Sequence, residues 1–289
     1  MQRKKVLYIG ASICIIFILS CGNTNQEEQN IYSQSNFWKD GYFHQTNVIT
    51  PDKDKNTIRA KVDGKWQEYT LQKFPEQFLE WNTERRKETI AVIKEMIAAK
   101  GKPSKGPDLA GPHNGIVASY GVEREDSKFK LNNAVKGMGF LPKREKIEEI
   151  IKLLKDTDDA PFPEKLKNLI YFYDNIDSLF DLNKQGSLEL YSTPEFETQT
   201  FLNQMTNPIS TIVFLDIPSY KLKTIVRLLH PDDPNLTEYE KNVVRYINDI
   251  HSYFHGKFPR DYIAVIYYVV EIYDNSPGRM DAMGRRIVP

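Results

Sequence analysis

The feature that most restricts the fold of this 289-residue chain is an internal repeat. Residues 158–180 align without gaps with residues 232–254, and 8 of the 23 aligned positions are identical. With one residue of gap, the similarity extends upstream from 141–156 to 217–230. Each copy has the pattern of a short amphipathic helix, an Asp-Asp loop and a longer helix. Neither copy can bury its apolar face alone, so we expect the two copies to pack together or on the segment between them. The two predicted helix–loop–helix units are residues 141–180 and 217–254.

Starting residues predict one further helix and support one of the repeat helices. Thr83 can cap a helix that runs toward Gly101, because a threonine side chain accepts a hydrogen bond from the first turn. Thr237 and Glu240 have the spacing of a capping box at the start of the second long repeat helix. The apolar face of the first helix carries Ile90, Ile93, Met96 and Ile97.

Two more helices complete the predicted helical part. Thr193 followed by Pro194 is typical of a helix start, with the proline in the first turn. Residues 261–273 are apolar on nearly every face of a helical projection. That stretch is too short to span a bilayer, which takes about 20 residues. We therefore expect 261–273 to form a central buried helix.

One short segment predicts β structure. Residues 57–71 contain two alternating runs on either side of Asp63-Gly64, a pair that favours a tight hairpin turn. Residues 101–115 form a Gly/Pro-rich loop without the GxxxxGK pattern of a phosphate-binding loop, and we interpret it as a linker. The predicted fold class is therefore mainly α, a helical-repeat or bundle domain with a small β-hairpin near the N-terminus.

The N-terminus has the order of a secretory signal. Arg3, Lys4 and Lys5 precede an apolar run over 6–19, and Ile18-Leu19-Ser20-Cys21 has the form of a bacterial lipobox. We expect cleavage before Cys21 and attachment of lipid to its sulfur; several acyl chains would anchor the protein stably. The alternatives are an ordinary signal peptide and a short anchor that is never cut.

Residues after Cys21 are rich in Asn, Gln, Glu and Ser, so we expect a disordered tether. Cys14, the other cysteine, lies in the signal run, which leaves the mature chain without a disulfide or a cysteine metal site. Cleavage would leave 36 basic and 39 acidic residues; this balance argues against a nucleic-acid-binding protein.

Histidines are the candidates for metal or catalytic chemistry. His251 and His255 are four residues apart on a predicted helix and could share a metal, but no third ligand follows from the sequence. His113 lies in the Gly-rich loop without a motif that ties it to a nucleophile or an acid. We expect structural roles for all three, no metal, no cofactor and no catalytic residue.

A basic stretch could bind polyanions such as sulfated glycans or anionic lipid. Its alternative reading, which we favour, is a set of solvated surface residues. The residues concerned are Lys128, Lys130, Lys136, Lys143, Arg144 and Lys146, with Arg285 and Arg286 near the C-terminus.

The phrases KIEEIIKLL, NLTEYEKNVVRYINDI and YSTPEFETQTFL resemble the helical repeat of surface lipoproteins from relapsing-fever spirochaetes. The resemblance covers about residues 141–273; it departs at Pro163, which stands where the second copy has Thr237. It implies an exported, all-helical surface antigen anchored in the bacterial outer membrane, and it transfers no catalytic residue.

These patterns divide the chain into six parts and favour a non-enzymatic interaction module on the cell surface, one that binds a host protein, matrix component or polyanion. A periplasm-facing structural or assembly lipoprotein and a hydrolase are the alternatives. The expected parts are the signal peptide 1–20, the tether 21–36, a hairpin plus helix 37–100, the loop 101–115, the helical domain 116–276 and the C-terminal tail 277–289.

Overall fold

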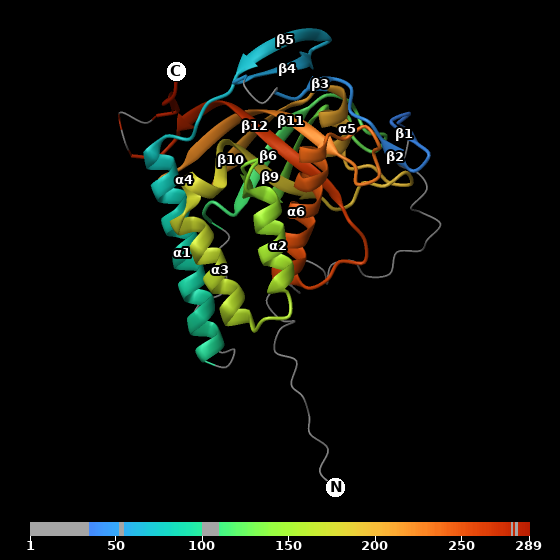
Figure 1. Cartoon of the computed structure of the whole chain (residues 1–289). Helices are drawn as coiled ribbons and strands as arrows, with labels where there is room; N and C mark the ends of the chain where they lie inside the picture. Colours follow the sequence, from blue (N-terminus) through green and yellow to red (C-terminus); the bar gives the residue numbers. More distant parts are fainter. Residues whose placement is uncertain (1–34, 52–54, 100–109, 279, 281–282) are drawn as a thin grey trace.

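The computed structural model describes residues 35–51, 55–99, 110–278, 280 and 283–289 (Figure 1). The predicted signal peptide, Cys21, most of the tether and residues 101–109 of the Gly/Pro-rich loop lie outside the described residues.

An antiparallel sheet of eight strands forms the centre of the described structure. Its strands follow the order β7-β6-β10-β11-β12-β9-β8, with β13 added to β12. Central strands such as β12 are buried on both faces, so their sequences are almost continuously apolar. The strands are β6 (Asn114–Tyr120), β7 (Leu131–Gly137), β8 (Gly139–Pro142), β9 (Phe180–Glu189), β10 (Ile209–Phe214), β11 (Tyr220–Leu229), β12 (Ile263–Asp274) and β13 (Arg285–Arg286).

The sheet curls strongly. Its outermost strands in the pairing order, β7 and β8, are consecutive in the chain, with only Met138 between them. The chain therefore passes directly from one end of the strand order to the other. Lys136 on β7 forms an ion pair with the buried carboxylate of Glu189 on β9, and this pair joins one end strand of the sheet to the strand beside the other end.

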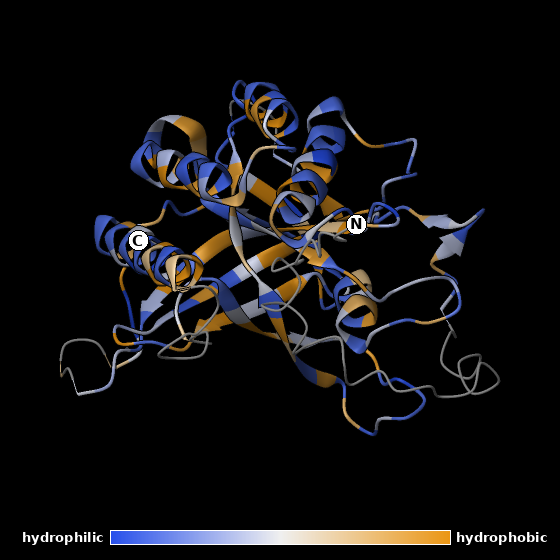
Figure 2. Cartoon of the chain, turned by 90° about the horizontal axis from the view of Figure 1, so that it is seen from below, coloured by the Kyte–Doolittle hydropathy of each residue, from blue (hydrophilic) through white to orange (hydrophobic). Residues whose placement is uncertain are grey.

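Helices α1 (Glu76–Ala98), α2 (Ile147–Asp156), α3 (Phe162–Asp174) and α6 (Glu238–His255) lie together on one side of the sheet, below the strands in Figure 1. α2 packs on α6, and α3 contacts both α1 and α6. Seen from this side, the outward faces of the helices are largely hydrophilic and the strands behind them largely hydrophobic (Figure 2). The helices are α1 (Glu76–Ala98), α2 (Ile147–Asp156), α3 (Phe162–Asp174), α4 (Ile176–Leu179), α5 (Gln199–Thr206) and α6 (Glu238–His255).

The predicted hairpin is confirmed. β4 (Thr57–Val62) and β5 (Lys65–Thr70) pair across Asp63 and Gly64, whose φ angles of 47° and 77° are those of the tight turn that the sequence favours. The chain after the hairpin attaches to the central sheet through the hydrogen bond from Gln72 N to Val269 O. The remaining short strands are β1 (Trp38–Lys39), β2 (Tyr42–Phe43) and β3 (Val48–Ile49), of which β3 extends the hairpin to three strands.

The prediction of a mainly α fold, which the spirochaete resemblance also implied, is wrong: the described chain combines the large antiparallel sheet with six helices. Residues 217–230, predicted as the first helix of the second repeat unit, contain strand β11. The matching stretch 141–156 ends β8 and forms α2. Only the second halves of the two copies agree, because 158–180 and 232–254 both contain a helix. The sequence similarity therefore does not correspond to two equal structural units.

Residues 261–273 were predicted as a buried helix and instead contain β12. The predicted burial of this stretch is confirmed, but the predicted helix is wrong. A continuous apolar run has no period that separates a buried helix from a buried strand. The stretch is rich in Ile, Val and Tyr, which favour a strand.

Of the three predicted helix starts, the one at Thr237 is confirmed, and those at Thr83 and Thr193 are wrong. The capping box of Thr237 and Glu240 is present at α6. α5 begins after Thr198 rather than at Thr193. Thr83 lies inside α1, which starts earlier, after Pro75, and its hydroxyl bonds to the carbonyl of Leu79.

Among the described residues, no helix combines the length and apolar character needed to cross a membrane.

Candidate ligand-binding pocket on the sheet

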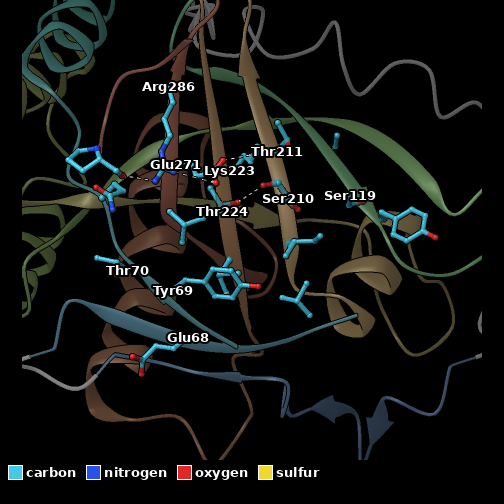
Figure 3. Close-up of a pocket in the computed structure, with 18 of the residues that line it drawn as sticks. Glu68, Tyr69, Thr70, Ser119, Ser210, Thr211, Lys223, Thr224, Glu271 and Arg286 are labelled. Atoms are coloured by element: carbon cyan, nitrogen blue, oxygen red, sulfur yellow. Dashed lines mark hydrogen bonds and ion pairs between the residues drawn. The ribbon is translucent and has the colours of Figure 1, made fainter. Parts of the chain in front are cut away.

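A pocket of about 740 Å³ lies between the β4–β5 hairpin and the central sheet (Figure 3). This volume is in the range of small-molecule sites, about 300–1,000 Å³. Strands β6, β10, β11 and β12 contribute to its floor; β5 and the residue Gln72 form its other wall, and the C-terminal residues Arg286 and Pro289 close one end.

The strand register arranges the floor in two rows. One row runs across the strands from Glu271 through Lys223 and Thr211 to Ala118, since each of these residues is paired with the next. The neighbouring row is apolar: Ile225 is paired with Ile209, and Tyr120 with Leu131. The pocket is therefore charged over β12 and β11 and apolar over β6 and β7.

The charged end is an ion-pair network around Glu271. Its carboxylate lies 2.8 Å from Lys223 Nζ and accepts a hydrogen bond of 2.6 Å from the hydroxyl of Tyr273. Desolvation opposes ionisation of Glu271, but these hydrogen bonds outweigh it, and the pKa of Glu271 is lowered. The hydrogen bond to Glu271 raises the pKa of Lys223. Both groups are therefore charged at neutral pH.

Arg286 stands at the outside of this network. Its Nη1 is 3.9 Å from Glu271, beyond hydrogen-bond distance, and its Nη2 donates to an oxygen of the terminal carboxylate of Pro289, the last residue of the sequence. Its other N–H groups have no acceptor among the residues that the structure describes. The side chain is 42% exposed, so it remains accessible to a ligand.

Among the lining residues of the described chain, several hydroxyl groups have no hydrogen-bond partner, including those of Tyr69 on the hairpin and Thr211 on β10. Figure 3 shows the ring of Tyr69 between the hairpin and the floor, whereas Glu68 lies at the outer margin. Desolvation raises the pKa of Tyr69, and the charge of Asp63 adds to this effect, so its phenol is a neutral donor. These hydroxyls can bind the polar part of a ligand.

The apolar end opens onto exposed hydrophobic side chains. Tyr120 is 48% exposed and Leu131 60% exposed, and both line the pocket. Phe129 and Val135 on the same β6–β7 hairpin are 74% and 63% exposed. A cluster of large apolar side chains at a pocket mouth is typical of a surface that a ligand or partner covers.

Two of the three candidate histidines come together. A Cβ atom at Gly137 would lie 3.7 Å from Nε2 of His113 and 4.0 Å from Nε2 of His251. His251 hydrogen-bonds through Nδ1 to the carbonyl of Ile247, which leaves Nε2 as the acceptor of the neutral ring. Desolvation lowers the pKa of His251 to about 4. Desolvation also lowers the pKa of His113, and the charge of Arg86 adds to that effect.

His255 lies one turn beyond His251, with 6.2 Å between the ring centroids. Within the described ranges, no group of three or more His, Cys, Asp or Glu residues has the geometry to hold a metal ion. The histidines therefore give a polar cluster between α6 and the start of β6, away from the residues that line the pocket.

The predicted basic patch is not one surface. Lys136 pairs with buried Glu189, and Lys146 pairs with Glu149 at the start of α2. Lys143 donates to the carbonyl of Asp177, and Arg144 stacks over Tyr239. Lys128 and Lys130 are exposed beside Phe129, and of the whole set Arg286 is the one that lines the pocket.

The sequence interpretation did not nominate Lys223, Glu271, Thr211 or Tyr69. One signal was present: in YKLKT (220–224) apolar and lysine residues alternate, which is the period of a strand with one solvated face. Because residues 217–230 were predicted to form a helix, this alternation was not interpreted as a strand. The pairing of Lys223 with Glu271 across two strands could not be inferred without the register.

Compared with known proteins, the chain matches no protein-family model, and no curated protein is significantly similar to it.

Proposed function

We propose that this protein is a lipid-anchored, extracytoplasmic bacterial binding protein without catalytic activity, and that the pocket on the sheet is its ligand site. The lipobox at Cys21 and the signal before it support the anchor. The pocket supports the binding role, because it combines a partly apolar floor, a few convergent polar groups and a volume suited to a small molecule. The pocket is the observation that carries the proposal.

The resemblance to spirochaete surface lipoproteins supports display on the outer surface, where the apolar mouth of the pocket could also meet a host protein or matrix component. Protease treatment of intact cells tests this placement. Surface display predicts digestion together with a known surface protein, and a protected chain would favour a periplasm-facing assembly role.

Lipid attachment is tested by growing expressing cells with an alkyne-tagged palmitate. We expect label on the full chain and none on Cys21→Ser. Equal label on both chains would refute the anchor site.

Binding is tested by mass spectrometry of small molecules that co-purify with the full chain. In Thr211→Trp, an indole would occupy the middle of the floor between the charged and apolar ends. We expect this variant to lose molecules that the native chain retains, while Lys94→Gln, an exposed change on α1, retains them. Identical extracts from all three proteins would refute the pocket as the ligand site.

A further inference from the structure

We propose that the β6–β7 hairpin inserts exposed apolar side chains into the bilayer that holds the lipid of Cys21. This inference rests on the proposed lipid anchor and adds a second membrane contact, one that orients the body on the membrane. The contact surface consists of Tyr120 at the end of β6, Leu131 at the start of β7 and Phe129 in the loop between them.

These three side chains lie at one end of the hairpin. Tyr120 and Leu131 are register partners on neighbouring strands, and Phe129 is two residues before Leu131. All three are exposed, and Phe129 is the most exposed of them. Large apolar side chains are unfavourable in water, and the boundary between lipid headgroups and acyl chains removes them from it.

The charges of the loop balance, so the apolar side chains decide the partner. The loop contains three acidic and three basic residues, and Arg124 and Asp126 pair with each other. Lys128 and Lys130 are exposed on either side of Phe129. Their long stems allow the ammonium groups to stay among the headgroups while the ring lies deeper. The surface therefore fits a bilayer interface, whether or not its lipids are anionic.

The point at which the N-terminal segment enters the described body lies beside this loop. Ser35, the first described residue, donates hydrogen bonds from its N–H and its hydroxyl to the carboxylate of Glu197. The carbonyl of Glu197 accepts from Nη1 of Arg124 in the loop, at 3.4 Å. Two residues further on, Nε2 of Gln199 donates to the carbonyl of Phe129 at 2.5 Å. One short segment therefore holds the entry point and the loop together.

This arrangement keeps the hairpin near any bilayer in which the lipid of Cys21 is inserted. From Cys21 to Ser35 there are 35 − 21 = 14 peptide bonds, which span at most about 50 Å when fully extended. A surface held this close meets the bilayer at a high effective concentration, so a weak apolar contact is sufficient. A partner in solution has no such advantage, and we therefore assign the surface to the bilayer.

Leu215 provides a control position, because it is an exposed apolar side chain far from the hairpin. In the pairing of β10 with β6, Ser210 lies opposite Ser119, which precedes Tyr120. Leu215 follows the other end of β10, about 17 Å along the strand from Ser210 at about 3.4 Å per residue. Interfacial insertion is about 5–10 Å deep, so a bilayer at the hairpin does not reach Leu215.

Photo-labelling from within the bilayer tests the contact. The full chain, purified with its lipid, is reconstituted into vesicles of phosphatidylcholine that carries a diazirine in an acyl chain, and the labelled residues are mapped by mass spectrometry. We expect label at Phe129 and Leu131, and about tenfold less at Leu215. Equal label at Leu215 would show that the bilayer contacts no preferred surface and would overturn the proposal.

Variants test whether the apolar side chains make the contact. Phe129→Ser should lower the label at Leu131 about tenfold and leave thermal unfolding unchanged, because the ring is exposed. The matched variant Leu215→Ser should leave the label at Leu131 unchanged. Label that appears only after phosphatidylglycerol is added to the vesicles would assign the contact to the lysines and overturn apolar insertion.

The docking surface and the anchor fail separately. If palmitate labels Cys21 but the hairpin takes no label from the bilayer, as when a second copy or another protein covers it, the docking is wrong and the anchor stands. If Cys21→Ser takes up palmitate as the native chain does, the anchor fails and the docking fails with it.

Discussion

The buried ion pair between Arg227 and Glu240 offers a direct test of the fold. Arg227 Nε lies 2.9 Å from Glu240 Oε1, and the two side chains are 6% and 4% exposed. Arg227 Nη1 also donates to the carbonyl of Gln45, and the second oxygen of Glu240 accepts from the backbone and hydroxyl of Thr237. The pair therefore joins β11, α6 and the N-terminal segment.

Replacement of Arg227 by Met removes the cation and leaves the Glu240 carboxylate buried. Loss of one partner of a buried pair costs about 3–5 kcal/mol. Glu240 keeps its hydrogen bonds from Thr237, so we expect the lower part of that range, about 3 kcal/mol. With a urea m-value of about 2 kcal/mol per M, the unfolding midpoint should fall by about 1.5 M.

Urea unfolding followed by circular dichroism measures this change. The control is Arg245→Met on α6, because Arg245 is 49% exposed and 3.8 Å from Asp249, an exposed pair worth less than about 1 kcal/mol. The double variant Arg227→Met/Glu240→Gln should recover part of the loss, since it leaves no unpaired charge and the amide oxygen can still accept from Thr237 N. A loss below about 0.5 kcal/mol for Arg227→Met, the value for an exposed residue, would refute the buried pair.

Three further changes test the packing, the helix start and the histidine cluster. Gly186→Ala places a Cβ 2.6 Å from Leu141 Cδ2 and 3.0 Å from Ile247 Cδ1, so thermal unfolding should show a loss of about 1–3 kcal/mol. Thr237→Ala removes the capping box and should cost about 1–2 kcal/mol in the same assay; no loss would contradict the cap. Because the folded pKa of His251 is about 4 and the unfolded one about 6.5, only the unfolded chain gains this proton as pH falls between these values. Stability should therefore fall through that window, by at most about 3 kcal/mol from this group, and His251→Gln should flatten the pH dependence measured by urea unfolding.

Local signals determined the parts of the structure that depend on neighbouring residues. Asp63-Gly64 sets a turn through its own backbone preferences, and the hairpin is present. The capping box of Thr237 and Glu240 joins residues three positions apart, and it is present too. The N-terminal signal and Cys21 are likewise readable from sequence order alone, and they stay predictions because they lie outside the described residues.

Tertiary structure decided whether the apolar segments became helices or strands. Residues 217–230 fit both periods, since Leu222, Ile225 and Leu229 lie on one helical face while Tyr220, Leu222 and Thr224 alternate with polar residues. β11 is a strand because β10 and β12 pair with both of its edges, and such long-range pairing overrides weak local preference.

The pocket could not be predicted from the sequence, for the same physical reason. Its charged end joins Lys223 and Glu271, which are distant in the chain and adjacent only through the register of β11 and β12. The third member, Arg286, lies on β13, which pairs with the last residues of β12. Sequence order fixes which side chains a strand presents to each face, but the partner strands, and with them the composition of a site, are set when the sheet assembles.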